Sequence, residues 1–314
     1  MRCNDPRGFV HAYFLYAPAR CAVLLCAAII GTAIVPSLTS ASEAASGFFT
    51  TSDGVKLHYL EAGKGPAIVF VPGWSMPAWI WGPQIEHFSA HFHVIALDPR
   101  AQGDSDKVDF GNYPERRARD IKELVEHLHL APAVLVGWSL AVPELLTYAE
   151  QFGGDTVRGY VLVDGFAWTK QDAQFIDGMV GMYRQVQTNR VEFTDKFVRS
   201  MYRHPQPEEY LKRLVTASLQ MPPDVAVSAS VSSISRADWS PAIAKLDRPV
   251  LVMCEVALKA MAADPITALM PSARVELFEN AGHAIFVDDA PHFSRALQAF
   301  IEHMPEAATS AERN

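Results

Sequence analysis

Cysteine is scarce in this chain, which limits how the fold can be stabilised. Only four cysteines occur among 314 residues, and three of them (Cys3, Cys21 and Cys26) lie near the amino terminus. If that segment is removed, Cys254 alone remains and no internal disulfide can form. The fold must then rely on a packed core, and a composition of 49% apolar and 20% charged residues is typical of a globular protein.

Long runs of positive charge are also absent, and the net charge is negative. The chain has 27 Lys and Arg against 35 Asp and Glu, a formal charge of -8. Proteins that bind nucleic acid through its phosphates need clustered basic residues. The sequence therefore argues against a nucleic acid partner and favours a small molecule or a peptide.

The apolar run near the amino terminus is too short for a stable transmembrane helix, which needs about 20 residues. It covers residues 21–35, follows Arg2, Arg7 and Arg20, and precedes a stretch of small residues. This pattern predicts an export signal. We expect residues 1–46 to be a signal peptide and short linker, cleaved near 41–46, which leaves a periplasmic or secreted protein without a membrane span. The alternative is an uncleaved membrane anchor, because residues 9–16 are also apolar.

From residue 47 onward, short β-branched runs alternate with longer segments of helical periodicity. Such alternation is typical of a mostly parallel sheet covered by helices. Residues 166–238 break the alternation and predict a helical cap. We expect an α/β core at 47–165 and 239–305, with a tail at 306–314. The expected strands are 48–51, 56–61, 67–71, 93–97, 133–136, 159–163, 250–253 and 274–278, and the expected helices are 79–90, 114–127, 140–151, three or four within 170–219, 259–269 and 291–303.

Ser139 stands where a buried strand turns abruptly into a helix. Gly137 and Ala141 flank it at two-residue spacing. A nucleophile on a strained strand-to-helix turn needs small residues at these positions, because the two backbones approach closely there. The spacing therefore predicts a nucleophilic serine. The alternative is a serine that only caps a helix.

A serine nucleophile needs a base, and His283 is the best placed of the 11 histidines. It follows the expected strand 274–278 in a loop that contains glycine, so it should lie at the carboxyl edge of the sheet, where ligands bind in α/β folds. The pairs His91/His93 and His127/His129 have no further ligand at suitable spacing, and we expect no metal site there.

Backbone N–H groups are also required to stabilise a developing oxyanion. The expected strand 67–71 runs into a glycine turn at Pro72, Gly73 and Trp74. The N–H groups of Trp74 and Leu140 are therefore the candidate donors.

Four motifs, which follow one another along about residues 47–305, together resemble those of a known protein family. They are Val71-Pro72-Gly73-Trp74, Asp98-Pro99-Arg100-Ala101-Gln102-Gly103-Asp104-Ser105-Asp106, Gly137-Trp138-Ser139-Leu140-Ala141 and Gly282-His283. In this respect the chain resembles the α/β-hydrolase fold family, and within it the serine esterase and cofactor-free haloperoxidase branch. The resemblance implies an eight-stranded sheet, a cap after the sixth strand and a Ser-His-acid triad without metal or organic cofactor.

Two positions depart from the pattern of that family. Pro72 replaces a frequent histidine, which matters little because the oxyanion donor is the following backbone. The second departure concerns the acid, since Ala257 and Leu258 stand where the family usually has Asp. Asp164, at the end of the expected strand 159–163, is our preferred replacement, because the fold offers that strand end as an alternative location.

Glu255 is the second candidate for the acid, and Asp264 lies too far along the following helix. A chain with no acid at all is the remaining alternative. The charged loop that holds Asp98, Arg100 and Asp104 is interpreted as loop architecture, with a substrate-binding role for Arg100 as the lesser alternative.

These residues favour a serine hydrolase that cleaves a carboxylic ester or lactone with an apolar acyl part through an acyl-enzyme on Ser139. The same triad could perform perhydrolysis with peroxide, as in cofactor-free haloperoxidases. The missing acid also leaves open a binding protein on a hydrolase scaffold.

Overall fold

The computed structural model describes residues 44–170 and 173–305. The predicted tail at 306–314 lies outside the described residues, and so does the predicted signal peptide apart from its last three positions. Within the described part of the chain, no helix has both the length and the apolar character needed to cross a membrane.

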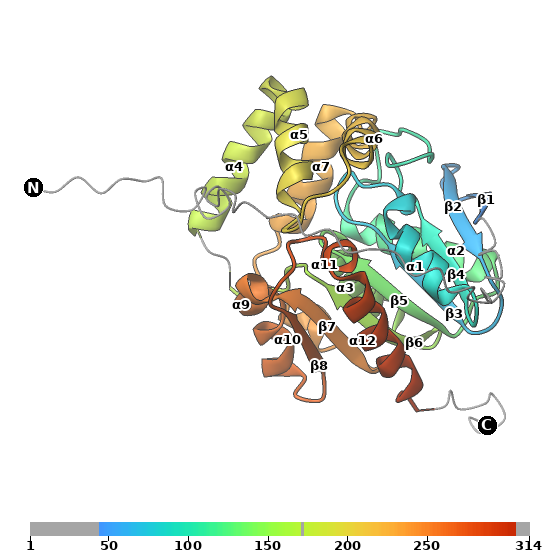
Figure 1. Cartoon of the computed structure of the whole chain (residues 1–314). Helices are drawn as coiled ribbons and strands as arrows, with labels where there is room; N and C mark the ends of the chain where they lie inside the picture. The colour runs from blue at the N-terminus through green and yellow to red at the C-terminus, as the bar shows by residue number, and fades with distance from the viewer. Residues whose placement is uncertain (1–43, 171–172, 306–314) are drawn as a thin grey trace, which may run out of the picture. The chain divides into compact units, whose positions relative to one another are not determined.

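Eight strands form one sheet in the order β1-β2-β4-β3-β5-β6-β7-β8 (Figure 1). Strand β2 runs antiparallel to both of its neighbours, and all other pairs are parallel. The predicted mostly parallel, eight-stranded sheet is confirmed. The strands are β1 (Ala45–Thr50), β2 (Lys56–Ala62), β3 (Ala67–Val71), β4 (His93–Leu97), β5 (Ala133–Trp138), β6 (Val157–Val163), β7 (Val250–Glu255) and β8 (Arg274–Phe278).

Strand β1 begins at Ala45 and not at Phe48, so the expected linker overlaps the sheet. Ala45 and Ser46 pair with Glu61 and Leu60 of β2. A boundary at residue 47 is therefore too late for the core, because backbone pairing with β2 extends the strand beyond its β-branched and aromatic residues.

Alternate residues of the strands pack into separate cores on the two faces of the sheet. Val69 and Leu135 belong to the core that also contains residues of α2 and α3, whereas Phe70 and Val136 belong to the core with residues of α1 and α12. Because side chains of a strand alternate between faces, near-continuous apolar strands such as β3 and β5 fit a sheet covered on both sides. The helices of the core are α1 (Gly82–Phe88), α2 (Pro114–His127), α3 (Ala141–Phe152), α8 (Ser240–Ile243), α9 (Lys259–Ala262), α10 (Asp264–Leu269), α11 (Ile285–Asp288) and α12 (Ala290–Glu302).

Two of the helices predicted from the sequence are divided in the structure. The segment 79–90 forms η2 (Ala78–Trp81) and then α1, which has Pro83 in its first turn. The segment 259–269 forms η3 (Val256–Leu258), α9 and α10, the last with Pro265 in its first turn. Proline lacks an N–H and fits a helix only near its start, so both prolines begin a new helix.

Four helices stand between β6 and β7 and form the cap: α4 (Ala173–Thr188), α5 (Arg190–Ser200), α6 (Glu208–Leu219) and α7 (Pro223–Ile234) (Figure 1). Pro207 directly precedes α6, and Pro222 directly precedes α7, whose first residue is Pro223. The expected helical insertion is present, although α7 extends it beyond the range where helices were predicted. The side chains of Phe193 and Phe197 in α5 reach Trp74 after β3, which places α5 over the carboxyl end of that strand.

Candidate active site

Ser139 occupies a strained turn between β5 and α3. Its φ of 56° lies in the left-handed region, which side chains other than glycine seldom adopt. A Cβ at Gly137 would lie 3.0 Å from the Ala141 carbonyl oxygen, and a Cβ at Gly73 would lie 2.9 Å from the Ser139 Cβ. Both glycines are therefore needed, because a side chain at either position would collide with the turn that holds Ser139. The turn lifts the serine out of the sheet at the carboxyl end of β5.

The structure brings His283 and Asp164 to this serine. His283 lies in the loop between β8 and α11, and its Nε2 is 2.9 Å from Ser139 Oγ. Its Nδ1 is 2.7 Å from Asp164 Oδ2, at the end of β6. These three residues come from three strand ends that are far apart in sequence, and they form one continuous hydrogen-bonded path.

The hydrogen bonds also define where the imidazole proton resides. The other oxygen of Asp164 accepts the N–H of Glu255 at 2.8 Å, and the carboxylate is fully buried. With Asp164 as acceptor, His283 Nδ1 is the donor, which leaves Nε2 to accept the Ser139 hydroxyl hydrogen. This is the arrangement that a general base needs.

The other two acids considered from the sequence lie elsewhere. Glu255 ends β7, and its backbone N–H supports Asp164, while no hydrogen bond joins its carboxyl group to His283 within the described residues. Burial and the negative charge of Asp164 raise the pKa of Glu255 to about 7. Asp264 forms an ion pair with Lys259 on the surface. Asp164 is thus the carboxylate that contacts the imidazole.

Trp74 and Leu140, the predicted oxyanion donors, flank the serine from two loops. Within the described residues, neither backbone N–H donates to a backbone carbonyl. Leu140 is also the N-cap residue of α3, so the positive end of that helix dipole faces the same place. Both side chains are buried against the cap, and Trp74 Nε1 donates to the Ala226 carbonyl oxygen in α7.

Trp138 supports the histidine in a way that the sequence motif does not reveal. Its Nε1 donates to the backbone oxygen of His283 at 2.9 Å, and its ring centroid lies 5.1 Å from that of the imidazole. The residue beside the serine therefore positions the imidazole of His283. No signal in the sequence distinguishes this tryptophan from a core residue, because its partner is 145 positions away.

The histidine loop is also joined to the cap. Asp288 accepts the backbone N–H groups of Gly282 and of Arg203, which follows α5. The N–H of Ala284 donates to the Met201 carbonyl oxygen at 2.9 Å. The position of His283 thus depends on the segment between α5 and α6, a link that the sequence reasoning missed.

A substrate-binding role for Arg100 is wrong. The Arg100 side chain is fully buried, and it donates to Asp120 at 2.6 and 2.7 Å. Its desolvation is compensated by this carboxylate and by Asp53, so no charge is left for a ligand. The interpretation of this loop as architecture holds, and the neighbouring Gln102 donates to the Gly73 and Met76 carbonyl oxygens under the candidate oxyanion turn.

The family of the chain follows from comparison with known proteins. Residues 66–290 match the sequence model described as alpha/beta hydrolase fold. This chain belongs to the α/β-hydrolase family, and it is an enzyme of the hydrolase type.

Three relatives illustrate the similarity. The chain is 26% identical over 276 residues to a non-heme haloperoxidase of Rhodococcus erythropolis, covering 81% of this chain and 99% of that protein. It is 34% identical over 120 residues to a bifunctional esterase/perhydrolase of Acinetobacter calcoaceticus, covering 37% of this chain and 44% of that protein. An esterase structure from Exiguobacterium antarcticum superposes with a TM-score of 0.74 at 20% identity, over 81% of this chain and 98% of that one.

Proposed function

We propose that this hydrolase cleaves a carboxylic ester or lactone through an acyl-enzyme on Ser139. The observation that carries the proposal is the unbroken path of hydrogen bonds from Ser139 Oγ through His283 to Asp164. It lies where β3 and β5 are neighbours although β4 separates them in sequence, the kind of crossover point at which α/β sheets bind ligands.

In the proposed reaction, Ser139 Oγ attacks the substrate carbonyl carbon while its proton passes to His283 Nε2. Asp164 holds the imidazole by Nδ1 and stabilises its positive charge. The N–H groups of Trp74 and Leu140 bind the oxyanion. His283 then gives the proton to the leaving oxygen, and a water molecule that it activates hydrolyses the acyl-serine. Neither half of this reaction requires a metal or an organic cofactor.

The apolar surroundings of the serine favour a substrate with an apolar acyl part. Trp74 and Leu140 belong to a cluster of buried residues with Val186, Met221 and Val225 of the cap and its loops. An acyl chain or aromatic ring placed between this cluster and Ser139 would bury apolar surface, and each buried methylene contributes about 0.8 kcal/mol. We therefore expect turnover to improve with acyl length up to a limit set by the cap.

The test uses the folded full chain with p-nitrophenyl esters of increasing acyl length, lactones and amides. We expect ester hydrolysis that falls about 10³-fold or more in Ser139→Ala. The matched control is Ser232→Ala, at a partly exposed position of α7, which should hydrolyse esters like the wild type. A fluorophosphonate should label Ser139. A folded chain that neither hydrolyses esters nor reacts with this probe at Ser139 would instead be a binding protein.

Perhydrolysis is the second candidate, and the similarity to a haloperoxidase and to an esterase/perhydrolase favours it. Here hydrogen peroxide replaces water in attacking the acyl-serine and releases a peroxy acid. Adding peroxide and a carboxylic acid should then yield peroxy acid at a rate comparable to hydrolysis. If peroxy acid forms only at the level of Ser139→Ala, the reaction is hydrolysis alone.

We also propose export, on the pattern of charged, apolar and small residues at 1–46. Cleavage after residue 44 or earlier would leave β1 whole, because that strand begins at Ala45. Sequencing the amino terminus of the protein recovered from the periplasm or the medium tests this proposal. An intact amino terminus in the membrane fraction would indicate an anchor.

A further inference from the structure

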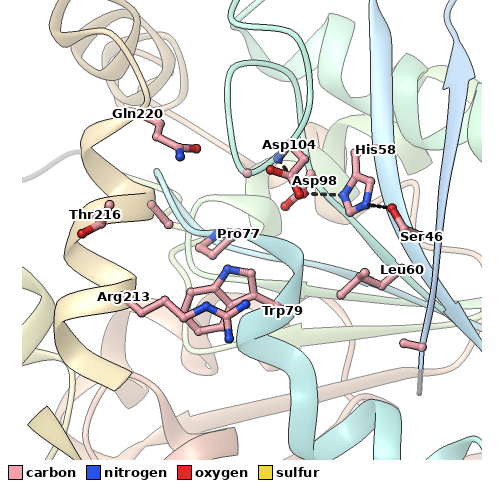
Figure 2. Close-up of a pocket in the computed structure, with 13 residues that line it drawn as sticks. Ser46, His58, Leu60, Pro77, Trp79, Asp98, Asp104, Arg213, Thr216 and Gln220 are labelled. Carbon is pink, nitrogen blue, oxygen red and sulfur yellow. Dashed lines mark hydrogen bonds and ion pairs between the residues drawn. The ribbon is translucent and has the colours of Figure 1, made fainter. Parts of the chain in front are cut away.

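A second serine–histidine–aspartate path lies at the antiparallel end of the sheet (Figure 2). Ser46 of β1 is 2.7 Å from His58 of β2, measured from Oγ to Nε2. His58 Nδ1 is 2.7 Å from Asp98 Oδ2, in the loop after β4. The order of atoms is the same as in the path from Ser139 to Asp164, yet no residue is shared.

The partners of Asp98 decide the direction of these hydrogen bonds. Its Oδ1 accepts the N–H of Ala78 at 2.5 Å, and its Oδ2 accepts the N–H of Asp104 at 2.9 Å as well as His58 Nδ1. With Asp98 as acceptor, the imidazole proton is on Nδ1. Nε2 is then an acceptor, and the Ser46 hydroxyl donates to it. The hydroxyl is therefore paired with a base that can remove its proton.

The three side chains differ in their access to solvent. The side chains of His58 and Asp98 are 4% and 3% exposed, whereas Ser46 is exposed on β1, at the edge of the sheet. A low dielectric strengthens the hydrogen bond between His58 and Asp98. The buried pair thus presents its accepting nitrogen to a hydroxyl that an external reagent can reach.

Ser46 also lines a pocket of about 590 Å³ between the sheet and helix α6. Figure 2 shows Leu60, Pro77 and Trp79 between Ser46 and α6, and Asp104 and Arg213 on opposite sides. The guanidinium of Arg213 lies 4.1 Å from the centroid of the Trp79 ring. An apolar middle between groups of opposite charge suits a small ligand without net charge.

We propose that Ser46 is a second nucleophilic serine, which becomes covalently acylated by small, uncharged, activated carboxylic esters. Ser46 Oγ attacks the carbonyl carbon and forms a new C–O bond, and the bond to the leaving oxygen breaks. The Ser46 proton passes to His58 Nε2 and from there to the leaving oxygen, which departs as the alcohol. The products are the acyl ester of Ser46 and one alcohol molecule.

We expect the acyl group on Ser46 to be retained longer than one on Ser139, because the base at Ser46 is less open to water. Hydrolysis of an acyl-serine needs a water molecule against the freed histidine nitrogen, as in the proposed reaction at His283, whose side chain is 24% exposed. The His58 side chain lines the pocket with Ser46 but is only 4% exposed. Ser46 is thus a site of lasting modification and not of turnover.

The experiment removes the first nucleophile and asks where an acyl group accumulates. The Ser139→Ala chain is incubated with p-nitrophenyl acetate and analysed by intact mass and peptide mapping. We expect one acetyl group on the peptide with Ser46, formed at least about 10²-fold faster than on the partly exposed Ser232, because a general base contributes at least this factor. The double variant Ser139→Ala/Ser46→Ala should lose this adduct, and Ser139→Ala/Ser232→Ala should keep it.

A second variant tests the base. Ser139→Ala/His58→Gln keeps groups able to hydrogen bond with Ser46 and Asp98, but it has no base, and should acylate at the rate of Ser232. If that variant does not fold, the solvent isotope effect on Ser46 acylation in Ser139→Ala reports the base, since proton transfer to a general base is slower in D₂O. Acylation of Ser46 no faster than Ser232, or equally fast in H₂O and D₂O, overturns the proposal. Because Ser139 is absent throughout, failure here is separate from failure of the proposed hydrolase.

Discussion

The two serine–histidine–aspartate paths have similar hydrogen-bond lengths, but the backbone that carries the serine differs between them. Ser139 sits on a turn with φ of 56° at the carboxyl ends of parallel strands, whereas Ser46 lies within an antiparallel strand pair. The first serine is next to candidate oxyanion donors at Trp74 and Leu140, and its histidine is partly open to solvent. The second is joined to a histidine that is almost fully buried.

The comparison teaches that hydrogen bonds among a serine, a histidine and an aspartate are not by themselves enough for repeated catalysis. Hydrogen bonds can polarise a hydroxyl wherever three suitable side chains meet. Repeated catalysis also needs donors for the oxyanion and access for water. Those requirements depend on the backbone around each serine, so the variants below act on one path and leave the other in place.

The largest expected effect is that of Asp164→Asn on ester turnover. The asparagine oxygen can still accept the N–H of Glu255, but its NH₂ group then faces His283 Nδ1, and the imidazole is no longer held in the tautomer that accepts from Ser139. We expect kcat to fall about 10³- to 10⁴-fold, measured by steady-state hydrolysis of the best ester.

Glu255→Gln is the comparison for that variant, and it should lower kcat less than tenfold because the Glu255 carboxyl does not contact the imidazole. The reverse order of the two effects would assign the acid to Glu255. Two variants with wild-type kcat would remove both acids from the mechanism.

Asp98→Asn should instead change stability. Asp98 Oδ2 accepts from both His58 and Asp104, so an NH₂ group there leaves these two donors, of which His58 is buried, without their acceptor, and the other flip of the amide leaves the Ala78 N–H unpaired. We expect the free energy of unfolding to decrease by about 1 to 3 kcal/mol, measured by urea denaturation. Asp104→Asn, at an exposed side chain, should stay within about 0.5 kcal/mol of the wild type. Equal effects of the two substitutions would show that Asp98 does not anchor the second path.

The pH dependence of stability should report Glu255. Burial and the charge of Asp164 raise its pKa from 4.5 to about 7, so between these values the native chain holds a proton that the unfolded chain has lost. Its contribution to stability is therefore lost as pH rises through this window. Relative to Glu255→Gln, the wild type should lose about 1 to 2 kcal/mol across the window, since part of the shift is screened by solvent.

Parallel curves for the wild type and Glu255→Gln in urea denaturation at several pH values would contradict this expectation. The comparison between variants is needed because histidines titrate in the same range. A flatter dependence of the unfolding free energy on pH in Glu255→Gln would show that Glu255, beside Asp164, keeps its proton in the native chain at pH values where the unfolded chain has lost it.

Trp138→Phe should have the smallest effect. It removes one hydrogen bond to the His283 backbone and keeps a ring against the imidazole. We expect kcat/KM to fall about fivefold, equivalent to about 1 kcal/mol. The matched control is Trp239→Phe, because Trp239 is equally buried and its Nε1 has no hydrogen-bond partner in the described structure. If both variants lose the same activity, the effect comes from packing and not from the hydrogen bond.

Local pattern was enough to predict much of the fold. The bounds of β3 and β4 agree with the sequence prediction, because these mostly buried strands are apolar runs ended by turn residues. The bounds of β8 agree as well, where Val275 and Leu277 alternate with charged residues. The start of β1 was missed, since Ala45 and Ser46 have no strand pattern of their own and are held by pairing with β2. The short helices around Pro83 and Pro265 were merged because helical periodicity continues across them.

The sequence by itself determined the strained serine turn, since that turn depends on small neighbours along the chain such as Gly137 and Ala141. The histidine loop also needs tertiary contacts, because Gly282 packs closely against the backbone of residues 201–203. Only the tertiary structure decided between Asp164 and Glu255. Both end neighbouring strands, where Val163 pairs with Met253, so sequence places them equally near the base, and the direction of each side chain makes the difference. Only the tertiary structure brings Ser46, His58 and Asp98 together, because these residues come from β1, β2 and the end of β4, and their hydrogen bonds depend on how these strands are paired.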